Sequence, residues 1–205
     1  LNFDETALNT FKPSICNRLD RNTSGLLVCG KTLEGLRVNN ELIKTKAVKK
    51  FYLALVKGKV SKKSAISGWL YKDEKTNKVI IKNAEFEKAD YIQTEYEPIE
   101  YFDDATLLSV KLITGKAHQI RAHLASISHP IIGDFKYGNR SVNETYKKKY
   151  GIKWQMLHSY KLIYENEDIS DTKTFKALKG KCFVAEYNGD FRKVIGDGNL
   201  EDKRS

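Results

Sequence analysis

Apolar side chains fall in short runs separated by polar turns, and this pattern predicts a chain rich in strands. Four runs are bounded by glycines or carry aromatic and β-branched residues, as strands do; they cover residues 25–29, 50–57, 156–164 and 181–187. Two further pairs of runs flank short polar stretches and predict hairpins; they join residues 69–71 to 79–81 and residues 91–101 to 106–113. The run at 25–29 is expected to be a buried strand.

Helical periodicity is confined to two segments. Thr32 can cap a helix, and the apolar side of that helix would carry Leu33, Leu36, Ile43 and Ala47. A second short helix is expected within residues 117–128, with one buried face formed by Ile120, Leu124 and Ile127. Hairpins with only a few helices predict an α+β fold with a largely antiparallel sheet.

Nothing along the sequence marks a domain boundary, because it contains no internal repeat, low-complexity block or Pro- or Gly-rich linker. We therefore expect one domain over residues 1–205, with a polar, frayed tail from residue 196. The chain begins with Leu1 and its one methionine is Met156. We expect a fragment or a processed chain that has lost its N-terminal part.

An excess of ten positive charges favours a polyanionic partner held through its phosphates. RNA, DNA and anionic lipid all fit this charge, and so does a plain solvated basic surface. Three cysteines at wide spacings, without a C-x-x-C pair, argue against a disulfide framework or a zinc site and favour the reducing cytoplasm. No apolar run approaches the roughly 18 residues that a membrane span needs.

One carboxylate stands between two arginines in residues 17–25, NRLDRNTSG. The guanidinium groups of Arg18 and Arg21 favour the ionised form of Asp20. An ionised carboxylate can serve as a nucleophile or as a countercharge. A structural salt bridge is the competing interpretation of the same residues.

Alternation in residues 50–56 places Tyr52, Ala54 and Val56 on one face of the predicted strand. A tyrosine on a sheet face can stack against a nucleic-acid base, because every base offers a π surface. Plain packing is the other common role of a strand tyrosine.

The densest group of polar residues is TGKAHQIRAH, residues 114–123, followed by HPIIGD, residues 129–134. His118 and Arg121 lie three positions apart, on one side of the predicted helix, and can face a site together. Three of the four histidines and Asp134 fall here, but their spacing fits no standard zinc pattern. An amphipathic helix with polar residues facing solvent is the alternative.

Together these segments resemble the pseudouridine synthases that modify ribosomal and transfer RNA, in the branch typified by the ribosomal large subunit enzymes. Residues 17–27 resemble the motif around that branch's catalytic aspartate, and residues 50–58 the motif whose tyrosine stacks on the target base. Residues 114–138 resemble the third motif and residues 157–160 a weaker final one. The likeness spans residues 12–165, in the family's order.

Two positions depart from the family's pattern: Asn17 stands where histidine is usual, and Lys116 where arginine is usual. Neither change removes the proposed nucleophile. The family's opening strands, and the small RNA-binding domain that many members carry before them, have no match in this sequence.

The resemblance implies the family's catalytic fold, a largely antiparallel mixed sheet with flanking helices and loops around a basic cleft. It implies isomerisation of uridine to pseudouridine with neither metal nor organic cofactor. The partner would be RNA, with ribosomal RNA first and transfer RNA as the alternative, and neither DNA nor a membrane. The enzyme would be a cytoplasmic monomer.

The resemblance also implies a role for each candidate residue. Asp20 would attack the sugar or the base, and Arg121 would pair with it and keep it ionised. Tyr52 would stack beneath the uracil and could take the proton from carbon 5. Arg18 would help to flip the uridine out and fill the gap it leaves. Three further residues complete the substrate-binding set: Lys116, His118 and Ile120.

Two other functions stay open. An inactive RNA-binding module of the same fold would fit the altered Asn17 and the unmatched opening strands. A metal-dependent nuclease would have to be built on four side chains, those of His118, His123, His129 and Asp134.

Overall fold

The computed structural model describes residues 11–73, 79–165, 172–187 and 189–196. Its main sheet has the strand order β10-β9-β4-β8-β7-β5-β6, with every neighbouring pair antiparallel, and β2 adds a parallel pairing to β9. The strands are β1 (Ser14–Ile15), β2 (Ser24–Gly25), β3 (Cys29–Gly30), β4 (Val48–Lys57), β5 (Ser64–Lys72), β6 (Val79–Lys82), β7 (Asp90–Tyr101), β8 (Ala105–Leu112), β9 (Leu157–Tyr164) and β10 (Cys182–Val184).

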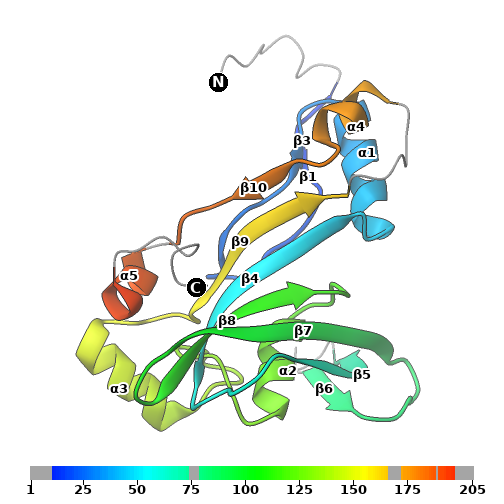
Figure 1. Cartoon of the computed structure of the whole chain (residues 1–205). Coiled ribbons are helices and arrows are strands. Elements are labelled where there is room, and N and C mark those ends of the chain that lie inside the picture. The colour runs from blue at the N-terminus through cyan, green and yellow to red at the C-terminus, as the bar shows by residue number, and fades with distance from the viewer. Residues whose placement is uncertain (1–10, 74–78, 166–171, 188, 197–205) are drawn as a thin grey trace.

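Helices lie at both ends of the long central strands β4 and β9 (Figure 1). The helices are α1 (Leu33–Lys44), α2 (Gln119–Ser126), α3 (Arg140–Tyr150), α4 (Lys173–Leu178) and α5 (Gly189–Ile195). In Figure 1, α1 and α4 lie at one end together with β1 and β3, and α3 and α5 lie at the other. α2 packs against β6 and β7. The predicted α+β fold with a largely antiparallel sheet is confirmed.

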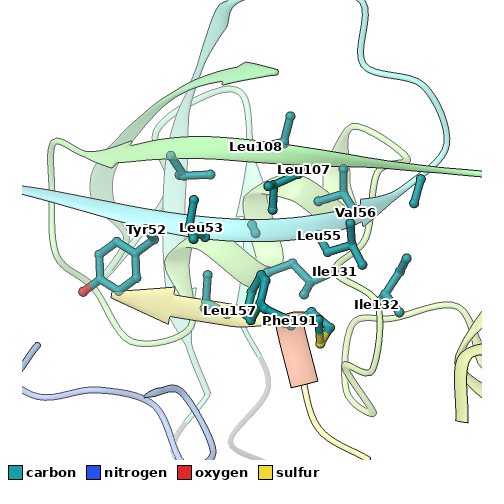
Figure 2. Packing of buried hydrophobic residues seen from close by; sticks show 14 of the residues in the cluster. Tyr52, Leu53, Leu55, Val56, Leu107, Leu108, Ile131, Ile132, Leu157 and Phe191 are labelled. Atoms are coloured by element: carbon teal, nitrogen blue, oxygen red, sulfur yellow. The ribbon is translucent and has the colours of Figure 1, made fainter. Parts of the chain in front are cut away.

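Strand β4 forms the centre of the larger core, because it is bonded to β9 on one side and β8 on the other. Its residues 53–56 are completely buried, so both faces of the strand are covered. Figure 2 shows these side chains packed against Leu107 and Leu108 of β8 and against Ile131 and Ile132. Tyr52 lies at the edge of this cluster, and its hydroxyl points away from the aliphatic side chains (Figure 2).

Helix α1 begins where the sequence predicts. The Thr32 hydroxyl oxygen accepts a hydrogen bond from the backbone N–H of Gly35 at 3.0 Å, which satisfies one of the free donors of the first turn. The buried side of α1 differs from the prediction, since Leu33 is exposed and the buried positions are Gly35, Asn39 and Leu42. Ala47 is buried as expected, but beyond the end of the helix, in a smaller second core with β9 and α4.

Both predicted hairpins are present: β5 pairs with β6, and β7 pairs with β8. The polar turn between β5 and β6 falls largely at 74–78, outside the described residues. The strand expected at 181–187 is shorter, covering only β10, and its residues are exposed. The one-domain organisation stays a prediction, and residues 197–205 of the predicted tail lie outside the described part of the chain.

The buried strand predicted at residues 25–29 is wrong. The chain there belongs to a longer irregular stretch, residues 14–30, that we call the docked segment. Its regular pairing is limited to β1 with β3 and β2 with β9, two residues each, and Leu27 is 48% exposed. Apolar composition alone suggested burial, but a segment that lies on the outside of the sheet leaves part of that surface in solvent.

Gly25 sets how closely the docked segment approaches β9. Its φ is +108°, and a Cβ placed there would lie 2.1 Å from the carbonyl oxygen of Ser159. Only glycine fits both the backbone conformation and the contact. The next residue, Leu26, donates its N–H to that same carbonyl at 2.8 Å, and the Ser24 hydroxyl bonds to Nδ1 of His158 at 2.8 Å. The segment that carries Asp20 is therefore anchored, at residues 24–26, to a strand from the other end of the chain.

Within the described ranges, no helix is long and apolar enough to cross a membrane.

Candidate active site

A cleft of about 680 Å³ opens between the docked segment, β4 and the stretch that leads into α2. Six of the seven candidate residues line it: Arg18, Asp20, Tyr52, Lys116, His118 and Ile120. The seventh, Arg121, lies behind the lining and reaches Asp20 from within α2. The structure thus brings Asp20 together with Arg121, although the two residues are 101 positions apart in the sequence.

Asp20 and Arg121 form an ion pair. Nη1 of Arg121 donates to Oδ2 of Asp20 at 3.1 Å, and the exposed fraction of the Asp20 side chain is 22%, against 10% for Arg121. The Asp20 carboxylate is therefore held by the Arg121 guanidinium, while part of its surface stays open to the cleft. Such a carboxylate is oriented and still accessible to a ligand.

Asp134 fixes the other side of the same guanidinium. Nε and Nη2 of Arg121 donate to its two carboxylate oxygens, at 2.7 and 2.9 Å, and the Asp134 side chain is completely buried. The backbone N–H groups of Lys136 and Tyr137 also donate to Oδ1 of Asp134. This two-point contact leaves Arg121 with little freedom to turn away from Asp20.

Burial disfavours the charged forms of both Arg121 and Asp134, but the attraction between the two charges is stronger. Burial alone would lower the pKa of Arg121, yet the hydrogen bonds and charges of Asp134 and then Asp20 raise it. Burial would likewise raise the pKa of Asp134, and the contact with Arg121 lowers it. Both groups therefore stay charged around neutral pH.

The sequence analysis did not identify Asp134 as a positioning residue, since it placed this carboxylate only in a hypothetical metal set. A usable signal was present: an arginine on a helix with a buried face needs a carboxylate partner, and the third motif contains one. His123 and His129, also in that set, have other partners. His123 bonds Thr94 at 2.8 Å, and His129 bonds the Lys57 carbonyl at 2.9 Å. The described residues contain no group of three or more potential metal ligands.

Helix α2 differs from the amphipathic helix that the sequence predicts. Residues 119–124 are all buried, including the polar Gln119, Arg121 and His123, so no polar face is turned to solvent. His118 is not part of the helix but precedes it, in the left-handed region at φ 57°. It still lies near Arg121, because the Tyr137 side chain contacts both residues.

His118 is held in that turn by Tyr137. Its Nδ1 and the Tyr137 hydroxyl share a hydrogen bond of 2.9 Å, and the Arg121 guanidinium lies 5.2 Å from the centre of the Tyr137 ring. Burial lowers the pKa of His118, against the opposing influence of Asp20. Burial raises the pKa of Tyr137 to about 12. His118 is consequently a neutral imidazole at pH 7, able to donate or accept one hydrogen bond at the cleft.

Tyr52 forms part of the cleft floor. It is buried in β4, directly opposite Ser159 of β9, with its hydroxyl at the edge of the core. Burial raises the pKa of Tyr52, and the charge of Asp20 raises it further. The side chain is therefore a neutral phenol at pH 7, with a ring beside the cleft.

Five basic side chains line the cleft: Arg18, Arg21, Lys50, Lys72 and Lys116. Among the described lining residues Asp20 is the one acidic group. Lys116 is partly neutralised by Asp90, whose carboxylate lies 2.7 Å from its ammonium. Burial lowers the pKa of Lys50, which the sequence analysis did not single out although it lies two positions before Tyr52, on the same side of β4.

Asn17, the first departure from the family's pattern, has a local structural role. Its side-chain oxygen accepts the backbone N–H of Val28 at 2.8 Å, and this bond closes the docked segment on itself. The amide is thus used to shape the loop that presents Asp20. The second departure, Lys116, keeps a cation at the cleft.

The comparisons with known proteins agree with one another. A family model described as RNA pseudouridylate synthase matches residues 3–126. An uncharacterized RNA pseudouridine synthase of Mycoplasma genitalium is 34% identical over 170 residues, which cover 82% of this chain and 51% of that protein. The ribosomal large subunit pseudouridine synthase D of Borreliella burgdorferi is 34% identical over 79% of this chain and 47% of its own length. The chain thus spans about half the length of these curated relatives.

A solved structure has the same fold. Human RNA Pseudouridylate Synthase Domain Containing 1 aligns with a TM-score of 0.69 over 90% of this chain and 72% of that one, at 23% identity. At this level of identity the alignment establishes the fold.

Proposed function

Because this chain belongs to the RNA pseudouridylate synthase family, we propose that it converts uridines in RNA to pseudouridine, with Asp20 as the nucleophile. The observation that carries the proposal is the contact between Asp20 and Arg121 at the wall of the cleft. A carboxylate that is oriented by a guanidinium and partly exposed to the cleft is suited to nucleophilic attack on a nucleoside.

In the proposed reaction the bond between N1 of uracil and C1′ of ribose breaks, and a bond between C5 and C1′ forms. N1 gains a proton and C5 loses one, so atoms and electrons balance without an oxidant or reductant. Asp20 attacks the sugar or the base, and leaves again when the new bond has formed. Arg121 and Asp134 keep Asp20 in position throughout, since both are fixed by buried contacts.

We assign Tyr52 to stacking against the uracil. Its raised pKa favours the neutral phenol, which cannot accept the C5 proton without passing on its own. Arg18 is exposed at the rim of the cleft and is suited to take the place of a uridine that has left its stack. Lys116, His118 and Ile120 contact the flipped nucleotide in this proposal.

Large-subunit ribosomal RNA is the proposed substrate, because relatives at about one third identity are named as ribosomal large subunit enzymes. Transfer RNA is the alternative. We expect the enzyme to work as a monomer in the cytoplasm, without metal or organic cofactor.

The test is release of tritium from RNA labelled at carbon 5 of uracil, since only turnover frees that hydrogen. We expect Asp20→Asn to abolish release while the fold and RNA binding are kept, because the amide preserves the shape but not the charge. Asp190→Asn, a surface carboxylate paired with Lys193, is the matched control and should release tritium like the unsubstituted chain.

Unchanged turnover in Asp20→Asn would overturn the mechanism. RNA binding without any tritium release from the unsubstituted chain would favour the inactive binding module. Assays on ribosomal and transfer RNA in parallel separate the two substrates.

A further inference from the structure

Two large aromatic side chains lie exposed and in contact with each other, each next in sequence to a residue that contacts Arg121 or the docked segment. Phe135 is 68% exposed and Trp154 is 47% exposed, and their ring centres are 5.9 Å apart at an angle of 78°. Single exposed apolar residues are common on proteins, but two touching aromatic rings in solvent are a typical feature of a binding surface. Neither residue has a part in the function proposed above.

The pair is rigidly mounted. Gly133, at φ +79°, lies so close to Trp154 that an added Cβ would be 2.1 Å from the Trp154 carbonyl oxygen. Met156, two residues after Trp154, donates its N–H at 2.8 Å to the carbonyl of Ile132, which directly precedes Gly133. Because the backbone under both rings is fixed, a ligand that stacks on them loses little entropy in ordering the protein.

The sequence neighbours of the pair belong to the catalytic centre. Asp134, directly before Phe135, holds Arg121. Gln155, directly after Trp154, donates to the backbone carbonyl of Arg21 at 2.6 Å, and Arg21 lines the cleft. The backbone that carries the aromatic pair is therefore tied both to the docked segment, one residue after Asp20, and to the guanidinium that holds Asp20.

The surroundings of the pair carry positive charge. Arg21, Lys136 and Lys153 are exposed, and each adjoins Phe135, Trp154 or Asp20 in the sequence. Arg21 and Lys153 make no ion pair with any residue that the structure describes. The acidic neighbour, Asp134, is buried and already bound to Arg121. Aromatic rings beside exposed cations fit a single-stranded nucleic acid, whose bases stack and whose phosphates are anionic.

We propose that Phe135 and Trp154 form a stacking platform for an unpaired base that neighbours the target uridine in the RNA. This inference rests on the proposed function for the identity of the ligand, and it adds a second contact point outside the catalytic cleft. It makes single-stranded loops the preferred substrate, since a base inside a duplex has no free face to offer.

The platform can be tested by binding a fluorescently labelled, unstructured oligouridine in the Asp20→Asn background, where turnover does not interfere. Stacking of one base contributes enough that Trp154→Ala should weaken binding by roughly tenfold. Trp154→Phe keeps an aromatic face and should restore most of the affinity. Phe183→Ala is the matched control, because Phe183 is also an exposed phenylalanine in edge contact with another ring, on β10.

Trp154 itself gives a second readout. The chain has two tryptophans, so in a Trp69→Phe variant the fluorescence of Trp154 alone is observed, and stacking should quench it when oligouridine is added. A fully paired RNA duplex should leave the signal nearly unchanged.

Equal affinities for Trp154→Ala and Phe183→Ala, or no quenching by oligouridine, would overturn the platform. These outcomes are separate from the tritium assay. Binding and quenching without any tritium release would support the platform and contradict the proposed reaction. Tritium release without quenching, and without weaker binding in Trp154→Ala, would contradict only the platform.

Discussion

The two walls of the cleft differ in how firmly their residues are held. On one wall Arg121 and Asp134 are buried, joined by two short hydrogen bonds and supported by backbone N–H groups. On the other wall the docked segment, with Asp20, has regular pairings of only two residues each and several exposed positions. The proposed reactive group thus belongs to the lightly held wall, and the groups that orient it belong to the core. Stability and catalysis should respond differently to changes in the two walls.

The largest expected effect breaks the buried wall. Asp134→Ala removes the two-point partner of the Arg121 guanidinium, whose side chain is only 10% exposed. We expect a loss of about 3–5 kcal/mol in the free energy of unfolding, measured by urea denaturation. Asp20→Asn, on the other wall, should cost less than about 1 kcal/mol, because its ion pair is single and partly exposed. Equal losses in the two variants would remove the distinction between the walls.

The second expected effect is a loss of stability at low pH, and it also concerns the buried wall. His123 is completely enclosed, its Nε2 has no hydrogen-bond partner in the described chain, and burial lowers its pKa to about 4. Between the ordinary histidine pKa of about 6.5 and about 4, the unfolded chain binds a proton that the folded chain does not. Stability should therefore fall as the pH falls through this window, by at most about 3 kcal/mol from this residue.

The measurement is the free energy of unfolding at a series of pH values, for the unsubstituted chain and for His123→Gln. The glutamine has no proton to gain, so its profile should be flatter between pH 6.5 and 4. Parallel profiles would show that His123 does not carry the effect. Below this window the lowered pKa of Asp134 predicts a further loss, as that carboxylate becomes protonated.

A smaller expected effect on stability than that of Asp134→Ala sharpens the contrast from the other wall. Gln155→Ala removes the hydrogen bonds to the Arg21 carbonyl and to the Thr23 hydroxyl, which should cost about 1 kcal/mol. Turnover should fall by roughly 10- to 100-fold, because the segment that presents Asp20 loses its alignment. This loss in rate is larger than the small loss in the free energy of unfolding would produce. Tritium release and urea denaturation on the same samples give both numbers. Gln93→Ala, a half-buried glutamine on β7, is the control, and an equal fall in its turnover would contradict the prediction.

Much of the sheet could be predicted from local pattern. The hairpins β5–β6 and β7–β8, strand β4 and the Thr32 cap of α1 all depend on residues close together in the sequence. Helix α3 was missed although Asn139 caps it and Gly151 ends it, because lysines dilute its apolar stripe. Helices α4 and α5 are short and carry even weaker periodicity.

The candidate residues lie together, as the motifs predicted. The buried residues that hold them in place were not predicted. Periodicity treats a polar residue as exposed, so a helix with its polar side in solvent stayed open as the alternative, and the burial of Gln119, Arg121 and His123 was not predicted. Their partners are Thr94 of β7 and Asp134, and no pattern within the helix reveals them. The same limit applies to residues 25–29, where apolar side chains suggested a buried strand and the close approach of Gly25 to Ser159 decided otherwise.

Because residues 24 and 25 dock on β9, the site can form only after β9 has been synthesised. Ser24 meets His158, which follows it by 134 positions, so this contact has to wait until strand β9 has been synthesised. At ordinary translation speeds that interval is roughly ten seconds, during which the growing chain already carries Asp20 without the strand that receives it. A nascent or prematurely ended chain therefore lacks the support of the segment that carries Asp20, and only the arrival of β9 completes the cleft.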